Sequence, residues 1–153
     1  VRQRRFDRAL LCVEPDVLDA LSTLRRAGVR LALVSNADRM DVHAWPNSPL
    51  VDFFEAVVFS CDVAACKPDP AIYLAACRAL AVRAEGCLFV GDGGGDELAG
   101  AAALGMVPVQ LTAILDRYFP QLVEPQGVYA QHRIAHLSEL SACCAERDEL
   151  PTL

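Results

Sequence analysis

The feature that most constrains the fold of this chain is an alternation of short, continuous apolar runs with segments of helical periodicity. An apolar run without alternating polarity is typical of a strand that is buried on both faces, as in a parallel sheet covered by helices. The predicted strands are Arg30–Val34, Ala56–Ser60, Cys87–Val90 and Val107–Leu111. The predicted helices are Pro15–Arg26, Pro70–Leu80 and Glu97–Leu104. This order predicts an α/β domain with a three-layer α/β/α, Rossmann-like parallel sheet and right-handed crossovers.

The last third of the chain is less regular. Leu115–Tyr129 combines prolines with aromatic residues and has no clear period, so we expect an irregular connection across the surface. Arg133–Ala135 predicts a short final strand, and Leu137–Cys144 predicts a terminal helix. A length of 153 residues favours one compact domain.

Composition and charge exclude several classes of protein. The formal net charge is −6, whereas a nucleic-acid binder needs a basic face. No apolar run reaches the roughly 18 residues of a membrane-spanning helix, and no signal-peptide pattern follows the arginines at the start. Seven cysteines, an odd number without metal-ligand spacing, favour buried thiols in a reducing compartment. We therefore expect a cytoplasmic protein with neither a nucleic-acid nor a membrane partner.

Polar side chains follow the first two predicted strands, at the edge where parallel sheets bind ligands. Ser35 and Asn36 end the first strand, and Lys67 opens the sequence KPDP after the second. Ser35, Asn36 and the amides beyond them would donate hydrogen bonds to phosphate oxygens, and Lys67 would balance negative charge. The alternatives are that Ser35 satisfies backbone groups, Asn36 is a turn residue, and Lys67 is a solvated loop lysine.

The third predicted strand runs directly into an acidic, glycine-rich loop with the sequence GDGGGDE at residues 91–97. Carboxylates at the end of a buried strand are hard oxygen ligands suited to Mg²⁺, and glycines let the backbone bring Asp92 close to an ion. Asp96 and Glu97 are the further carboxylates of the same loop. The alternative is a turn whose acids only cap the following helix.

Together these residues resemble the haloacid dehalogenase (HAD) superfamily of hydrolases, which are mostly Mg²⁺-dependent phosphatases. LVSN at residues 33–36 is similar to its second motif, in which Ser or Thr closes a strand. KPDP at residues 67–70 resembles the third motif, and FVGD at residues 89–92 with the glycines after it resembles the fourth, metal-binding motif. The three motifs occur in this order, each after a strand, and the resemblance covers roughly residues 15–139, nearly the whole chain.

The resemblance implies a HAD-like fold, Mg²⁺ as cofactor and a small phosphorylated metabolite as substrate. Ser35 and Lys67 would be catalytic and, with Asn36, would bind the phosphoryl group. The metal acids would be Asp92 and a second acid, which in this family lies four or five positions further on. Asp96 and Glu97 both qualify: residue type favours Asp96, and counting back from Gly100 favours Glu97. Family chemistry transfers the phosphoryl group to an Asp carboxylate, and water then attacks the aspartyl phosphate.

The first motif of the family, Asp-x-Asp after the first strand, has no recognisable counterpart here, although its leading Asp is the nucleophile. Only 34 residues precede Ser35, and none of them forms an apolar run that ends in this pattern. We therefore expect an incomplete core that lacks the first strand and the cap domain and is weakly active or inactive. Residues 1–14 would be a cap remnant or linker, 15–146 the core and 147–153 a tail.

A second hypothesis is a non-catalytic, truncated HAD-like protein that binds phosphate, Mg²⁺ or a protein partner. Loss of a central strand would expose the edges of its neighbours, so homo-oligomers could form through an exposed sheet edge. A phospho-acceptor receiver domain also carries acids and a lysine at strand ends, but it holds its paired acids near the first strand. The order of the motifs here does not fit a receiver.

Overall fold

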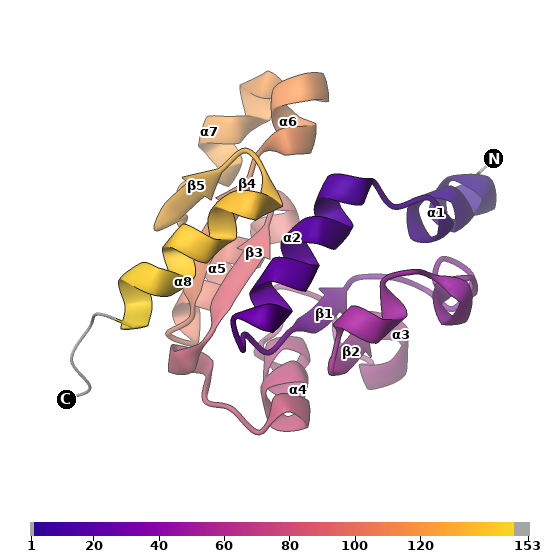
Figure 1. The fold of residues 1–153 in the computed structure, drawn as a ribbon, viewed down its shortest axis with the longest axis horizontal. Coiled ribbons are helices and arrows are strands. Elements are labelled where there is room, and N and C mark those ends of the chain that lie inside the picture. Colours follow the sequence, from indigo (N-terminus) through magenta and orange to yellow (C-terminus); the bar gives the residue numbers. More distant parts are fainter. Residues whose placement is uncertain (1, 149–153) are drawn as a thin grey trace. The chain divides into compact units, whose positions relative to one another are not determined.

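The computed structural model describes residues 2–148 of the chain (Figure 1). The chain divides into two compact units, Val1–Val82 and Arg83–Leu153, and each holds its own parallel sheet. Among residues 2–148, no helix combines the length and the apolar character needed to cross a bilayer. The predicted tail lies outside the described residues from position 149 onward.

The N-terminal unit is a two-stranded parallel sheet with helices around it. Its elements are α1 (Arg2–Leu11), α2 (Pro15–Arg26), β1 (Ala32–Ser35), the 3₁₀ turns η1 (Trp45–Asn47) and η2 (Val51–Phe53), β2 (Ala56–Phe59), α3 (Ser60–Val63) and α4 (Pro70–Leu80). The strands pair in register from Ala32 opposite Ala56 to Ser35 opposite Phe59. Helix α4 contacts both strands and buries Ile72 and Tyr73 completely, so it forms the core of this unit.

Helix α4 begins where its sequence dictates. The Asp69 carboxylate accepts a hydrogen bond from the Ala71 amide at 2.8 Å, and Pro70 occupies the first helical position, where its missing amide proton costs nothing. At the other end, Ala81 adopts a left-handed conformation with φ of 52°. Lys67 lies two residues before the Asp69 cap, so the start of the helix fixes the course of the KPDP segment.

The C-terminal unit is a three-stranded parallel sheet in the order β3-β4-β5. Its elements are η3 (Ala84–Gly86), β3 (Leu88–Gly91), η4 (Gly94–Asp96), α5 (Glu97–Ala103), β4 (Val107–Leu111), α6 (Ala113–Tyr118), η5 (Pro120–Leu122), α7 (Val123–Gln126), β5 (His132–Ile134), η6 (Leu137–Glu139) and α8 (Leu140–Asp148). Figure 1 shows α8 in front of this sheet and α5 behind it. Val109 in the central strand is fully buried, as a strand covered on both faces requires.

The parallel α/β organisation predicted from the sequence is confirmed, because all three strand pairings are parallel. Helices α2 and α4 have the predicted bounds, and the predicted strands agree with β1 to β4 within one or two residues. The strand and helix predicted after residue 130 correspond to β5 and to η6 with α8. The apolar runs therefore identified the sheet strands correctly.

Two predictions were wrong. Leu115–Tyr129 is not an irregular connection, since α6, η5 and α7 lie in or across it; these elements are only three to six residues long, too short to produce a recognisable period. The thiols are also less buried than predicted: Cys77 and Cys143 are buried, whereas Cys12 and Cys66 are exposed. An apolar neighbourhood in the sequence did not guarantee burial at a helix end or in a loop.

Candidate functional site

The polar residues of the N-terminal unit lie where β1 ends. Ser35 is the last residue of β1 and is half-buried, and Asn36 follows it on the surface. The Asn36 side chain makes two hydrogen bonds with the backbone of Lys67: its Nδ2 donates to the Lys67 carbonyl at 3.0 Å, and its Oδ1 accepts from the Lys67 amide at 2.7 Å. The second and third motifs are therefore joined directly, and Asn36 is more than a turn residue.

A second pair of hydrogen bonds fixes the next residue of this loop. The Ser60 hydroxyl, at the end of β2, donates to the Ala37 carbonyl and accepts from the Ala37 amide, both at 3.0 Å. Ser60 is buried, so these bonds are sheltered from water. Residues 36 and 37 are thus held from two directions, toward Lys67 and toward β2, which keeps the end of β1 in one conformation.

The acidic residues of the C-terminal unit lie on the loop between β3 and α5, which we call the acid loop (residues 91–97). The Asp92 Oδ1 accepts from the Gly94 amide at 2.8 Å, and the Glu97 Oε1 accepts from the Gly93 amide at 3.1 Å. Asp92 is exposed, whereas Glu97 is buried with 6% of its surface accessible. The loop therefore folds around its own two carboxylates.

Close packing inside the acid loop explains one of its glycines. A Cβ atom added to Gly91 would lie 2.1 Å from the Glu97 Oε1, so only glycine leaves room for that carboxylate beside the strand end. Asp96 differs from Glu97: it is exposed, adopts a left-handed backbone with φ of 57°, and lines a neighbouring pocket. The two candidates for the second acid therefore occupy distinct environments.

Sequence analysis missed a residue that supports the acid loop from the neighbouring strand. Gln110 on β4 is fully buried, and its Nε2 donates to the Asp92 carbonyl at 3.2 Å and to the Val123 carbonyl at 2.8 Å. Its Oε1 accepts from Arg133 Nε at 2.9 Å. The signal was present in the sequence, because Gln110 is the single amide side chain in the apolar strand VPVQL.

An ion pair at the surface extends this network. Arg133 Nη1 lies 2.6 Å from the Glu124 Oε1, and this hydrogen bond, with the positive charge of Arg133, lowers the pKa of the Glu124 carboxyl. The same bond raises the pKa of Arg133. The chain of contacts therefore runs from α7 through Arg133 and Gln110 to the backbone of Asp92.

The donor set of the acid loop fits Mg²⁺, because Asp92 and Glu97 supply carboxylate oxygens from one short loop. Within residues 2–148, no group of three or more His, Cys, Asp or Glu side chains is arranged to hold a metal ion. A magnesium ion bound here would keep several waters and take further ligands from a substrate phosphate. Two protein carboxylates are sufficient for that kind of site.

The predicted site residues thus form two groups. The N-terminal unit contains Ser35, Asn36 and Lys67, of which Asn36 and Lys67 are in direct contact. The C-terminal unit contains the acid loop with its three carboxylates. That both groups bind one ligand stays a prediction.

Comparison with known proteins identifies the class of protein. A sequence model described as haloacid dehalogenase-like hydrolase matches residues 3–104, about two thirds of the chain. The chain therefore belongs to the haloacid dehalogenase-like hydrolase family.

The chain is similar to individual relatives with different activities. The chain is 34% identical over 100 residues to a glyceraldehyde 3-phosphate phosphatase of Methanopyrus kandleri, covering 63% of this chain and 42% of the relative. It is 32% identical over 133 residues to (S)-2-haloacid dehalogenase 4A of Burkholderia cepacia, covering 85% and 54%. The crystal structure of a HAD phosphatase from Thermococcus onnurineus matches with a TM-score of 0.72 and 29% identity, covering 86% of this chain and 57% of that one. The chain spans about half the length of the relatives it matches.

Proposed function

We propose that this protein is the core of a Mg²⁺-dependent phosphohydrolase that acts on a small phosphorylated metabolite. The phosphatase relative and the family membership support this class of reaction. In the family reaction, an aspartate carboxylate attacks phosphorus and the substrate oxygen leaves; water then hydrolyses the aspartyl phosphate. In this proposal the described residues bind and orient the phosphoryl group and hold the metal.

The observation that carries the proposal is the pair of hydrogen bonds between Asn36 and the backbone of Lys67. These bonds anchor Lys67 beside the end of β1, one residue from Ser35. A hydroxyl and an ammonium group on adjoining segments suit a phosphoryl group, because Ser35 donates a hydrogen bond and Lys67 neutralises developing negative charge. Asn36 then acts as a positioning residue, since its side chain is already engaged by Lys67.

In the acid loop, Asp92 and Glu97 are the proposed metal acids. Glu97 is preferred to Asp96 because its carboxylate is folded back against the Gly93 amide, in the same turn as Asp92, whereas Asp96 faces a separate pocket. Bound Mg²⁺ would supply positive charge that stabilises the transferring phosphoryl group. The buried position of Glu97 and the Gly94 amide on Asp92 keep both carboxylates oriented before a metal arrives.

The nucleophile is the part of the proposed reaction that this sequence does not supply. No Asp-x-Asp pattern occurs anywhere in the 153 residues, and the acids of α1 and α2 lie on helices and not at a strand end. We therefore expect the 153-residue chain to bind Mg²⁺ and phosphate without turning over substrate.

Metal binding is tested with Mn²⁺ as a paramagnetic substitute for Mg²⁺. Amide signals of residues 91–97 should broaden at stoichiometric Mn²⁺, and added Mg²⁺ should reverse the effect. Asp92→Asn and Glu97→Gln should each weaken binding about tenfold or more, while Asp96→Asn and the distant Glu85→Gln should not. Unchanged broadening in Asp92→Asn would overturn the assignment of the metal site.

The anion site and the activity are tested separately. Inorganic phosphate titrated in the presence of Mg²⁺ should bind about tenfold more weakly to Ser35→Ala and to Lys67→Met, since a hydrogen bond to a charged group contributes about 1.5–3 kcal/mol. An aryl phosphate and glyceraldehyde 3-phosphate should release no phosphate above the blank. Turnover that disappears in Asp92→Asn would show that the chain is a complete enzyme and contradict the expected incompleteness.

A second candidate function, association without catalysis, is favoured by the edge of β1. This strand pairs with β2 alone in the sheet of the N-terminal unit, and its residues Ala32 to Ser35 are all half-buried. It contains no Lys, Pro or bulge of the kind that protects exposed edges. We propose that β1 is where a second copy pairs with this chain.

Light scattering after size exclusion distinguishes this role. Wild type should elute as a species larger than one chain, and Val34→Lys should lower the mass of that species, because a charge on the edge strand opposes pairing. Val63→Lys on helix α3 controls for the added charge. A wild-type monomer at every concentration would contradict the association role while leaving the metal and phosphate experiments unaffected.

A further inference from the structure

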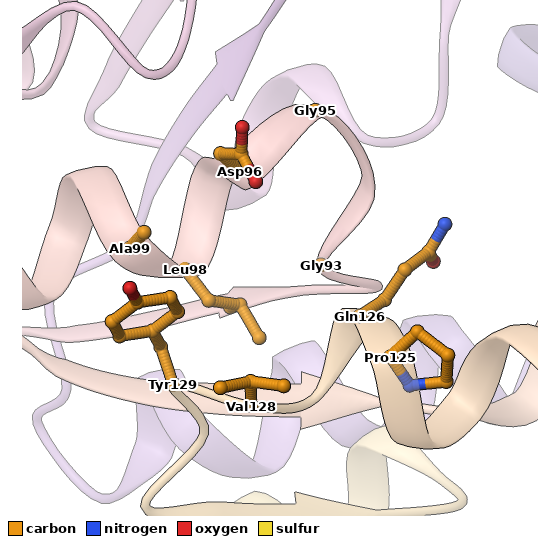
Figure 2. Close-up of a pocket in the computed structure, with 9 residues that line it drawn as sticks. All are labelled: Gly93, Gly95, Asp96, Leu98, Ala99, Pro125, Gln126, Val128 and Tyr129. Atoms are coloured by element: carbon orange, nitrogen blue, oxygen red, sulfur yellow. The ribbon is translucent and has the colours of Figure 1, made fainter.

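A small pocket lies beside the acid loop, within the C-terminal unit (Figure 2). Its volume is about 240 Å³, and it lies between the η4–α5 segment and the end of α7 with the turn after it. Drug-sized ligands occupy roughly 300–1,000 Å³. The pocket therefore suits a group the size of one amino-acid side chain.

The polar groups of the pocket favour a ligand that donates hydrogen bonds. Asp96 contributes an exposed carboxylate, and no Lys, Arg or His occurs among the lining residues. The Gln126 Oε1 is buried and has no hydrogen-bond partner within residues 2–148. The carboxylate of Asp96 is therefore the acceptor that the pocket offers to a ligand.

The apolar walls of the pocket favour an aliphatic chain near an aromatic ring. Leu98 is buried at the base, while Val128 and Tyr129 are 73% and 57% exposed. Figure 2 shows the Tyr129 ring beside Leu98 and Val128, with Asp96 above them and Gln126 at the Gly93 end. Val128 and Tyr129 therefore offer accessible apolar surface next to the Asp96 carboxylate.

We propose that this pocket binds an arginine side chain presented by another polypeptide. The methylene groups pack on Leu98 and Val128, and the planar guanidinium stacks near the Tyr129 ring while donating to the Asp96 carboxylate. Arginine has five donors in a planar fork, so the same group can donate more than one hydrogen bond to the Asp96 carboxylate. Lysine fits less well because its ammonium cannot stack and donate in one plane.

The chain itself carries a source of such side chains. Helix α1 has the sequence RQRRFDRALL, with a single acid, and its Arg4, Arg5 and Arg8 are exposed. The rest of this net-negative chain holds the complementary charge. A second copy that offers α1 to the pocket is therefore the partner that the charge distribution favours.

Binding is tested by nuclear magnetic resonance without divalent metal, so the result is independent of the proposed phosphohydrolase function. The probe is N-acetyl-L-arginine amide, and the matched control is its neutral citrulline analogue. Saturable shifts are expected at residues 95–99 and 126–129 with arginine only. Asp96→Asn should weaken binding at least threefold without loss of fold, since Asn accepts the left-handed backbone of residue 96. Tyr129→Ala should weaken it similarly, and Glu85→Gln should not.

Two results would overturn the proposal: no saturable shift with the arginine probe, or equal binding of the citrulline analogue. A separate experiment identifies the source of the arginine. If a second copy supplies it, replacing Arg4, Arg5 and Arg8 together by Gln should lower the mass of the species measured by light scattering, as should Asp96→Asn. If the mass is unchanged while the arginine probe still binds, the arginine comes from a different protein.

Discussion

The two candidate binding loops are built in opposite ways. The carboxylates of the acid loop in the C-terminal unit accept hydrogen bonds from amides no more than four positions away, such as the bond from the Gly93 amide to Glu97. The end of β1 in the N-terminal unit is held by Asn36 and Lys67, which are 31 positions apart. A local loop depends on which residues fit its backbone, whereas a long-range contact depends on the surrounding fold. Substitutions should therefore affect the two loops differently.

The largest effect is expected for Gly93→Ala, which tests whether backbone fit controls the acid loop. Gly93 has a φ of 93°, and an added Cβ would lie 2.2 Å from the backbone oxygen of Gln126. Left-handed strain of roughly 1–2 kcal/mol and overpacking of about 1–3 kcal/mol together predict a loss of about 2–5 kcal/mol in the free energy of unfolding. Chemical denaturation measures this loss.

The matched control for Gly93→Ala is Gly95→Ala in the same loop. Gly95 also has a positive φ, of 62°, but an added Cβ meets nothing within 4 Å. Its cost should be limited to the roughly 1–2 kcal/mol of strain. Equal losses in the free energy of unfolding for the two variants would show that the close contact between Gly93 and Gln126 does not contribute to stability.

A smaller effect is expected for Gly91→Ala, which tests the link between the strand end and Glu97. The new methyl group would displace a flexible carboxylate and not a backbone atom, so the loss of stability should be about 1–3 kcal/mol. Affinity for Mn²⁺, read from amide broadening, should fall at least tenfold. Gly86→Ala, where an added Cβ contacts nothing, should leave both quantities unchanged. Retained Mn²⁺ affinity in Gly91→Ala would exclude Glu97 as a metal ligand.

Asn36→Ala should lower the stability less than Gly93→Ala or Gly91→Ala, because a side-chain bridge on the surface contributes less than the fit of the backbone. Each of its two exposed hydrogen bonds should contribute near the lower limit of the usual range of about 0.5–1.5 kcal/mol. The free energy of unfolding should therefore fall by about 1 kcal/mol. Phosphate affinity should fall as well, since Lys67 loses its anchor. Asn47→Ala, an exposed amide in η1, is the control. Normal phosphate affinity in Asn36→Ala would separate the bridge from anion binding.

The smallest effect is expected from Glu124→Gln and concerns pH. The hydrogen bond from Arg133 lowers the pKa of the Glu124 carboxyl, so this pair stabilises the fold above the ordinary glutamate pKa of about 4.3. The contribution is lost as the pH falls through the lowered pKa. Melting temperatures of wild type and Glu124→Gln should differ slightly at pH 7 and converge in strong acid. A difference that grows on acidification would contradict this sign.

The acid loop and the strands were accessible to sequence analysis because their signals are contiguous. Four apolar runs gave β1 to β4, and the sequence GDGGGDE indicated an acidic turn at a strand end. The different environments of Asp96 and Glu97, on which the proposed choice between them rests, were not accessible, because they depend on which carboxylate turns back toward Gly91 and Gly93. That direction follows from packing and not from residue type.

Other features required the fold itself. The side chain of Asn36 forms hydrogen bonds with the backbone of Lys67, 31 residues away, and nothing in the sequence around Asn36 indicates this partner. Gln110 supports the acid loop from a neighbouring strand, so its role follows only from the pairing of β3 with β4. The short helices α6 and α7 were missed because one or two turns give too little periodicity to recognise.

The span of the Asn36–Lys67 bridge also has a consequence for the order of folding. Closing a segment of 31 residues costs chain entropy before any bond is gained, whereas the turn of the acid loop closes within a few residues. We expect protection of the Gly93 and Gly94 amides against hydrogen exchange to appear early during refolding, and protection of the Lys67 amide to follow only after β1 and β2 have paired. The contact between Asn36 and Lys67 would then form later than the acid loop.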